Sequence, residues 1–200
     1  MSAIQVNREE MIVSSVERRS DDNRYVSIFR TGRISRVGGE ELCVLRNIST
    51  GGAMIAHNGD LDIGERVTLD LRLDESLVAT VVWVKGERSG LQFDTEADLP
   101  KILAGHTAGP RPRPPRLRIA AIVGVTAGQT RARVTLRDIS QTGACFEEGK
   151  LPRVPELRVV LDGLGDYRAI VCWRRGGLIG VNFASTLPMW PLNDWVRSAR

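Results

Sequence analysis

The sequence has few of the residues on which metal and redox chemistry depend. Its only histidines, His57 and His106, have no cysteine or acidic partner at a spacing typical of metal ligands. The three cysteines are far apart and lie in apolar stretches, which predicts reduced, buried thiols. They are Cys43, Cys145 and Cys172. We therefore expect no metal site and no redox role.

Long apolar runs are also missing. No stretch approaches the roughly 18–20 apolar residues that a helix needs to cross a bilayer, and residues 1–20 lack the apolar segment of a secretory signal. Charged residues make up 26% of the chain and hydrophobic residues 42%, as in ordinary globular proteins. These features predict a cytoplasmic protein without a membrane span.

Lysine is scarce, although the net charge is +4. Only Lys85, Lys101 and Lys150 are lysines, so 25 of the 28 basic residues are arginines. An arginine side chain presents a planar fork that suits phosphates and guanine edges. A genome with GC-rich codons explains most of these arginines at least as well as a function does, so only clustered arginines bear on function.

The chain contains an internal repeat. LRNISTGG (45–52) recurs as LRDISQTG (136–143), at an offset of 91 residues. Similarly, ATVVWVKGERSGLQF (79–93) recurs as AIVCWRRGGLIGVNF (169–183), and in both copies Trp is followed by Gly seven residues later and by Phe ten residues later. Landmarks in the same order at a nearly constant offset indicate a duplicated domain of about 90 residues.

Each copy is predicted to be built from β-strands. VTLDLRL (67–73) alternates strictly between apolar and polar residues, as a half-buried strand does. The segments around Trp83 and Trp173 are rich in β-branched residues, so we expect both indoles in the core. Helical patterns are limited to 96–103 and 191–199, each at the end of a copy. Short strands separated by Gly-rich turns favour a small barrel in each half.

The segment between the copies is rich in Gly and Pro, which predicts an extended linker. We place the first domain at 1–104, the linker at 105–115 and the second domain at 116–200.

The repeated pattern resembles the PilZ domain family. NISTGG (47–52) and DISQTG (138–143) both fit [DN]-x-S-x-x-G, and each is followed by a Trp strand and a G-x-F strand. The resemblance implies two tandem six-stranded antiparallel β-barrels with short terminal helices. It also implies a bacterial receptor for the second messenger cyclic di-GMP, which is a ligand and not a catalytic cofactor.

The residues of the motif suit a guanine ligand. Asn47 and Asp138 offer short acceptor side chains for a guanine edge, and Asp138 is the stronger acceptor because it is ionised. The serines add a hydroxyl, and the glycines allow close approach of a ligand to the backbone. These further candidates are Ser49, Ser140, Gly52 and Gly143.

The family also implies an arginine pair, R-x-x-x-R, that wraps over the ligand. Here the candidate pairs are Arg19 with Arg24 and Arg111 with Arg116, and both are spaced by five residues instead of four. A flexible segment absorbs one extra residue at little cost, since doubling a loop costs only about 0.6 kcal/mol. Asp21 and Asp22 would oppose an anionic ligand in the first copy. We therefore expect the second domain to be the preferred ligand site.

Two functions remain open at this stage. One is a cyclic di-GMP receptor that changes the relative orientation of its barrels and so signals to a protein partner, which the sequence does not identify. The other is a degenerate tandem protein that binds no nucleotide and acts as a protein–protein adaptor. Nucleic-acid binding is a weaker option. No catalytic constellation can be assembled from two histidines, and there is no phosphate-binding G-x-x-x-x-G-K-[ST] loop, so we expect no enzymatic activity.

Overall fold

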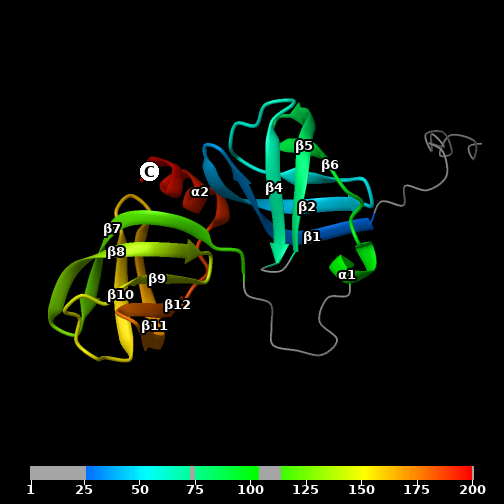
Figure 1. Ribbon diagram of the computed structural model, residues 1–200. Coiled ribbons are helices and arrows are strands. Elements are labelled where there is room, and N and C mark those ends of the chain that lie inside the picture. The colour runs from blue at the N-terminus through cyan, green and yellow to red at the C-terminus, as the bar shows by residue number, and fades with distance from the viewer. Residues whose placement is uncertain (1–25, 73–74, 104–113, 200) are drawn as a thin grey trace, which may run out of the picture.

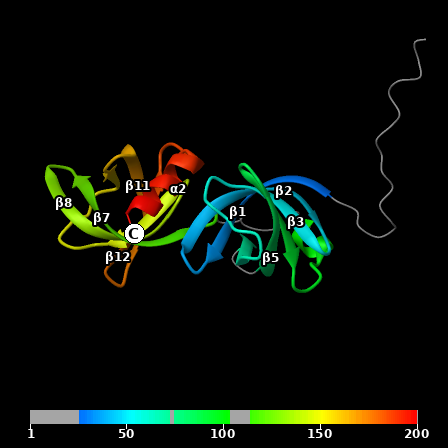
Figure 2. The ribbon, with the colours of Figure 1, turned by 90° about the horizontal axis from the view of Figure 1, so that it is seen from above.

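The computed structural model describes residues 26–72, 75–103 and 114–199, which form two closed antiparallel barrels of identical topology (Figure 1). The first barrel orders its strands β1-β2-β3-β6-β5-β4, and the second orders them β7-β8-β9-β12-β11-β10. The all-β tandem architecture predicted from the repeat is confirmed. Figure 2 views the two barrels from above.

The elements have the following bounds. The first barrel consists of β1 (Val26–Arg36), β2 (Gly39–Ser49), β3 (Gly52–Ala56), β4 (Arg66–Arg72), β5 (Glu75–Lys85) and β6 (Arg88–Phe93), followed by α1 (Leu99–Leu103). The second consists of β7 (Leu117–Ala127), β8 (Thr130–Ser140), β9 (Gly143–Glu147), β10 (Glu156–Leu161), β11 (Gly165–Arg175) and β12 (Leu178–Phe183), followed by α2 (Met189–Ser198).

Period-two alternation of apolar side chains builds both barrel interiors. Along β7 every second residue from Leu117 to Ala127 is buried, and along β4 the buried apolar residues are Val67, Leu69 and Leu71. Alternate side chains point to opposite faces of a strand, so a closed sheet directs one set into a shared core. Each barrel has its own apolar cluster.

The three cysteines differ in their environment. Cys43 and Cys145 are buried as predicted, but Cys172 is exposed, so the prediction of three buried thiols is wrong at that position. Cys172 lies on β11 directly before Trp173, where a register irregularity interrupts the alternation. Burial raises the pKa of the Cys43 and Cys145 thiols, which keeps both protonated.

Helix α2 joins the second barrel to β2 of the first (Figure 1). Asn193 is 1% exposed, and its Oδ1 accepts a hydrogen bond from Leu42 N at 2.8 Å while its Nδ2 donates to Leu42 O at 2.8 Å. Leu42 is a first-barrel residue, yet its side chain packs in the apolar cluster of the second barrel. Buried backbone groups need such partners, so this pairing fixes α2 on β2.

A second set of contacts connects the β1–β2 hairpin to the start of β7. Arg33 Nη1 donates to Arg116 O at 3.1 Å, and Arg118 N donates to Glu40 Oε2 at 2.7 Å. The Arg33 guanidinium is itself held by Asp70, with Nε and Nη2 at 3.0 and 2.8 Å from Oδ2. The backbone on which the second barrel begins is thus bound to the first barrel.

Neither helix in the part of the chain that the structure describes has the length and apolar character needed to cross a membrane.

The interface also buries a carboxylate. Glu41 is 3% exposed, and neither of its oxygens has a hydrogen-bond partner among the described residues. Arg197 Nη1 of α2 approaches Oε2 to 3.6 Å. Burial raises the pKa of Glu41, and the neighbouring Arg36, His57 and Arg197 offset that effect only in part.

This buried carboxylate predicts a pH dependence of stability. Because the pKa of Glu41 is higher in the folded state, the folded protein gains stability as the pH falls through that pKa and loses it as the pH rises. Glu41→Gln mimics the neutral form, so we expect it to raise the free energy of unfolding at neutral pH and to flatten the pH profile. Denaturant unfolding from pH 5 to 8 measures this, with the exposed Glu96→Gln as the control. A steeper profile in Glu41→Gln contradicts the assignment.

Candidate functional site

One row of residues crosses five strands on the outer face of the first barrel. Each residue is paired in register with the next, which places their Cα atoms side by side across the sheet. In order from β1 to β5 the row is Ser27, Asn47, Met54, Gly90 and Trp83. The predicted acceptor and the repeated Trp–Gly pair thus belong to one continuous surface.

A β-bulge turns Asn47 outward. Leu45 pairs with Ile55 and Asn47 pairs with Met54, so Arg46 is an extra residue on β2. Leu45 and Ile48 are fully buried, and strict alternation between them would direct Asn47 inward. The extra residue shifts the phase and leaves Arg46 and Asn47 both on the outer face.

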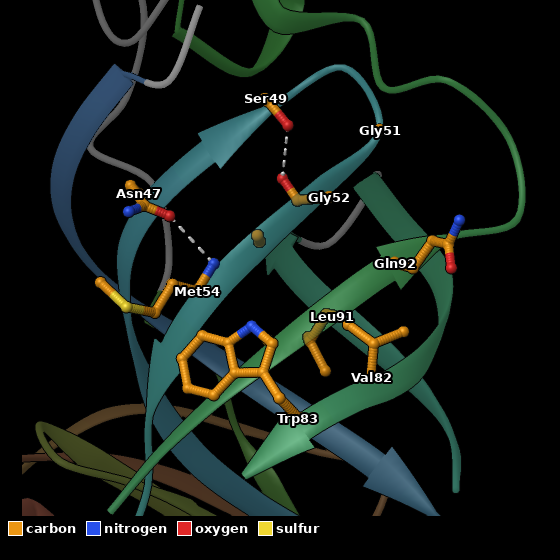
Figure 3. A pocket seen from close by; sticks show the side chains of 11 residues that line it. Asn47, Ser49, Gly51, Gly52, Met54, Val82, Trp83, Leu91 and Gln92 are labelled. Atoms are coloured by element: carbon orange, nitrogen blue, oxygen red, sulfur yellow. Dashed lines mark hydrogen bonds between the residues drawn. The ribbon is translucent and has the colours of Figure 1, made fainter. Parts of the chain in front are cut away.

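The rest of the motif stabilises the turn beside Asn47 (Figure 3). Ser49 is 2% exposed, and its Oγ donates to Gly52 O at 3.3 Å. A Cβ atom on Gly52 would lie 2.4 Å from Leu91 O of β6, so only glycine fits at this close approach. Asn47 is partly exposed, and its Oδ1 accepts a hydrogen bond from Met54 N at 3.1 Å (Figure 3).

The tryptophans are not core residues, and the prediction that they would be is wrong. Trp83 is half-buried outside the apolar cluster, and Trp173 is 43% exposed. A Cβ atom on Gly90 would lie 2.0 Å from Trp83 Nε1, and one on Gly180 would lie 2.1 Å from Trp173 Nε1. Each indole therefore covers a glycine of the neighbouring strand. The seven-residue Trp-to-Gly spacing in both copies was the signal that could have revealed this.

The row borders a pocket of about 420 Å³. Asn47 and Met54 line it on one side, Trp83 and Val82 on the other, and Gln92 stands at the edge (Figure 3). Sequence reasoning identified Asn47, Ser49 and Gly52 but missed the pocket's apolar wall, because it assigned Trp83 to the core.

The corresponding row of the second barrel carries charge. From β7 to β11 it consists of Arg118, Asp138, Cys145, Gly180 and Trp173. Ser140 is fully buried and its Oγ donates to Gly143 O at 3.2 Å, as in the first copy.

Arg116 forms an ion pair with Asp138. The structure therefore brings together two predicted site residues from the second arginine segment and the second motif. Arg19, Arg24 and Arg111 lie outside the described residues, as does most of the predicted linker 105–115. Within the described ranges no group of three potential metal ligands lies close together.

Comparison with known proteins identifies the class of the first domain. Residues 17–104 match the PilZ domain family. The matched region contains β1 to β6, Asn47 and the pocket beside it, so the PilZ match covers the first barrel.

Several solved structures match most of the length of the chain. They include the PlzA protein of Borreliella burgdorferi in complex with c-di-GMP, with 10% identity, a TM-score of 0.36 and coverage of 88% of this chain and 94% of that one. They also include the Bacillus subtilis inhibitor of motility MotI, with 11% identity, a TM-score of 0.31 and coverage of 87% and 96%. The MrkH–c-di-GMP complex of K. pneumonia has 13% identity, a TM-score of 0.32 and coverage of 84% and 83%. Similarity at this level is too low to transfer a function. No curated protein sequence matches the chain.

The indole–glycine contact can be tested by substitution. In Gly90→Ala the new Cβ would overlap the Trp83 indole, so we expect the indole to leave its position and the free energy of unfolding to fall by about 1–3 kcal/mol. Tryptophan fluorescence and thermal unfolding measure the two effects. Gly38→Ala is the matched control, since a Cβ there meets nothing within 4 Å. Equal behaviour of the two variants would refute the contact.

Proposed function

We propose that this protein is a receptor for cyclic di-GMP and that the outer-face rows of its barrels bind the ligand. The observation that carries the proposal is that Asn47, the acceptor of the PilZ motif in the family-matched domain, borders an open pocket. The family resemblance implies the ligand, and the pocket supplies a surface of suitable chemistry for it.

The first row offers complementary contacts to a guanine. An asparagine amide carries one acceptor oxygen and two N–H donors. It therefore suits a guanine edge that presents both hydrogen-bond donors and acceptors. Met54 beside Asn47 and the Trp83 indole across the pocket provide apolar surface. Arg19 and Arg24 precede β1 in the chain, and we propose that they close over the ligand as the arginine pair of the family does.

The second row offers a stronger acceptor that is already engaged. Asp138 accepts through both oxygens when ionised, but Arg116 forms an ion pair with it. Ligand binding here would exchange this internal pair for contacts of Asp138 with a guanine edge and of Arg116, together with Arg111, with the ligand. The preference for the second domain that the sequence favours remains a prediction.

This exchange provides a route from ligand binding to the relative orientation of the barrels. The carbonyl oxygen of Arg116 accepts the hydrogen bond from Arg33, and two residues later Arg118 N donates to Glu40. A displacement of the Arg116 backbone would therefore strain the contacts between the β1–β2 hairpin and β7. We propose that this coupling carries the signal to a protein partner.

The adaptor remains the second candidate, because β11 carries exposed apolar residues within 170–173. Ile170 is 54% exposed and Trp173 is 43% exposed, next to the exposed Cys172. Exposed apolar side chains gathered on one strand are typical of protein-binding surfaces. This surface is compatible with either function, so nucleotide binding decides between them.

Calorimetric titration with cyclic di-GMP tests the receptor. We expect the intact protein to bind the ligand, and Asn47→Ala, Asp138→Ala and Arg116→Ala each to weaken one site by roughly tenfold, as for a lost hydrogen bond to a charged or polar partner. Asp162→Ala, an exposed acidic position in the β10–β11 turn, is the control. An absence of heat with the intact protein would eliminate the receptor and favour the adaptor.

Small-angle scattering tests the switch. We expect a saturating concentration of cyclic di-GMP to change the radius of gyration of the intact protein. Arg33→Ala removes the hydrogen bond to Arg116 O, so it should reduce this change. The affinity of the site beside Asn47 for the ligand should stay the same. Binding without any change in the radius of gyration would refute the coupling but not the receptor.

A further inference from the structure

A large aromatic side chain stands exposed next to the first row. Phe29 of β1 is 75% exposed, and the guanidinium carbon of Arg46 lies 4.6 Å from the centroid of its ring. A cation within about 6 Å of an aromatic face is attracted by the electron density of the ring. The pair is thus a cation–π stack at the surface.

Two strand irregularities place this stack beside Asn47. The pairing of β1 with β2 is interrupted between Ser27 and Arg30, where Ile28 packs against the core and Phe29 faces solvent. On β2 the bulge makes Arg46 the extra residue next to Asn47. The stack therefore adjoins the side of the pocket that Asn47 lines.

The second barrel does not repeat this arrangement. The position that corresponds to Phe29 is Ala120, and Arg137, the counterpart of Arg46, forms an ion pair with Glu147. In the first barrel the counterpart of Glu147 is Ala56, and no described carboxylate pairs with Arg46. The duplicated arginine thus serves a salt bridge in one copy and an aromatic stack in the other.

We propose that Phe29 and Arg46 form a platform on which one purine base of the ligand stacks in the first barrel. This inference rests on the proposed function, because the base is that of the nucleotide bound beside Asn47. The base would extend the existing stack of Phe29 and Arg46. The platform gives the first barrel a stacking contact with a base, and the second barrel lacks this contact.

The test isolates the first barrel within the intact chain. In an Asp138→Ala background, where binding at the second row is weakened, Phe29→Ala should reduce the affinity for cyclic di-GMP by roughly tenfold, as expected for the loss of one base–aromatic stack. Ile63→Ala is the matched control, since Ile63 is an apolar residue of similar exposure, 70%, outside the row. Circular dichroism verifies that both variants are folded.

A spectroscopic measurement separates stacking from a structural role. Stacked bases absorb less ultraviolet light, so binding should reduce the guanine absorbance in the Asp138→Ala protein and in its Ile63→Ala variant, but not in Phe29→Ala. Phe29→Trp preserves an aromatic face, and we expect it to retain both the affinity and the absorbance change.

The outcomes distinguish the platform from the receptor. Unchanged affinity and absorbance in Phe29→Ala would refute the platform and leave the receptor standing. Binding by the unsubstituted protein but none by Asp138→Ala would place the ligand in the second barrel and likewise refute the platform. An unsubstituted protein that binds no cyclic di-GMP would refute both proposals.

Discussion

The candidate site depends on the bulge in β2 and its counterpart in β8. In each strand one extra residue shifts the phase of the alternation, so that Asn47 and Asp138 face outward between buried neighbours. Without that residue the polar side chain would point into the barrel, where it would lose its hydration without a partner. The bulge therefore explains how a polar motif can lie inside an otherwise apolar strand sequence.

The same backbone supports two surfaces of different charge. Both rows end in an indole over a glycine, and both buried serines bond to the glycine carbonyl of their turn. The acceptors differ: Asn47 is neutral and bonded to backbone, whereas Asp138 is paired with Arg116. Duplication thus preserved the parts that hold the turn and the indole, and varied the groups that a ligand would contact.

Sequence reasoning predicted the fold well and the site in part. The repeat offset, the alternation in 67–73 and the [DN]-x-S-x-x-G motif lead to two barrels and to the turn beside Asn47. The prediction that Trp83 is buried was wrong because a bulge cannot be recognised from a hydrophobic pattern. An apolar residue in a strand is therefore predicted to be buried even where a bulge turns it outward. The contact of Asn193 with Leu42 was beyond prediction, since it joins residues that lie 151 positions apart.

The position of the second row ties ligand chemistry to domain packing. The short stretch from Arg116 to Arg118 supplies a side chain to Asp138, a carbonyl to Arg33 and an amide to Glu40. A guanine edge at Asp138, as proposed, would compete with the Arg116 guanidinium for the carboxylate oxygens. Asp138 is therefore linked through Arg116 to the segment that holds the two barrels together. By contrast, the α2–β2 contact through Asn193 involves no residue of either row.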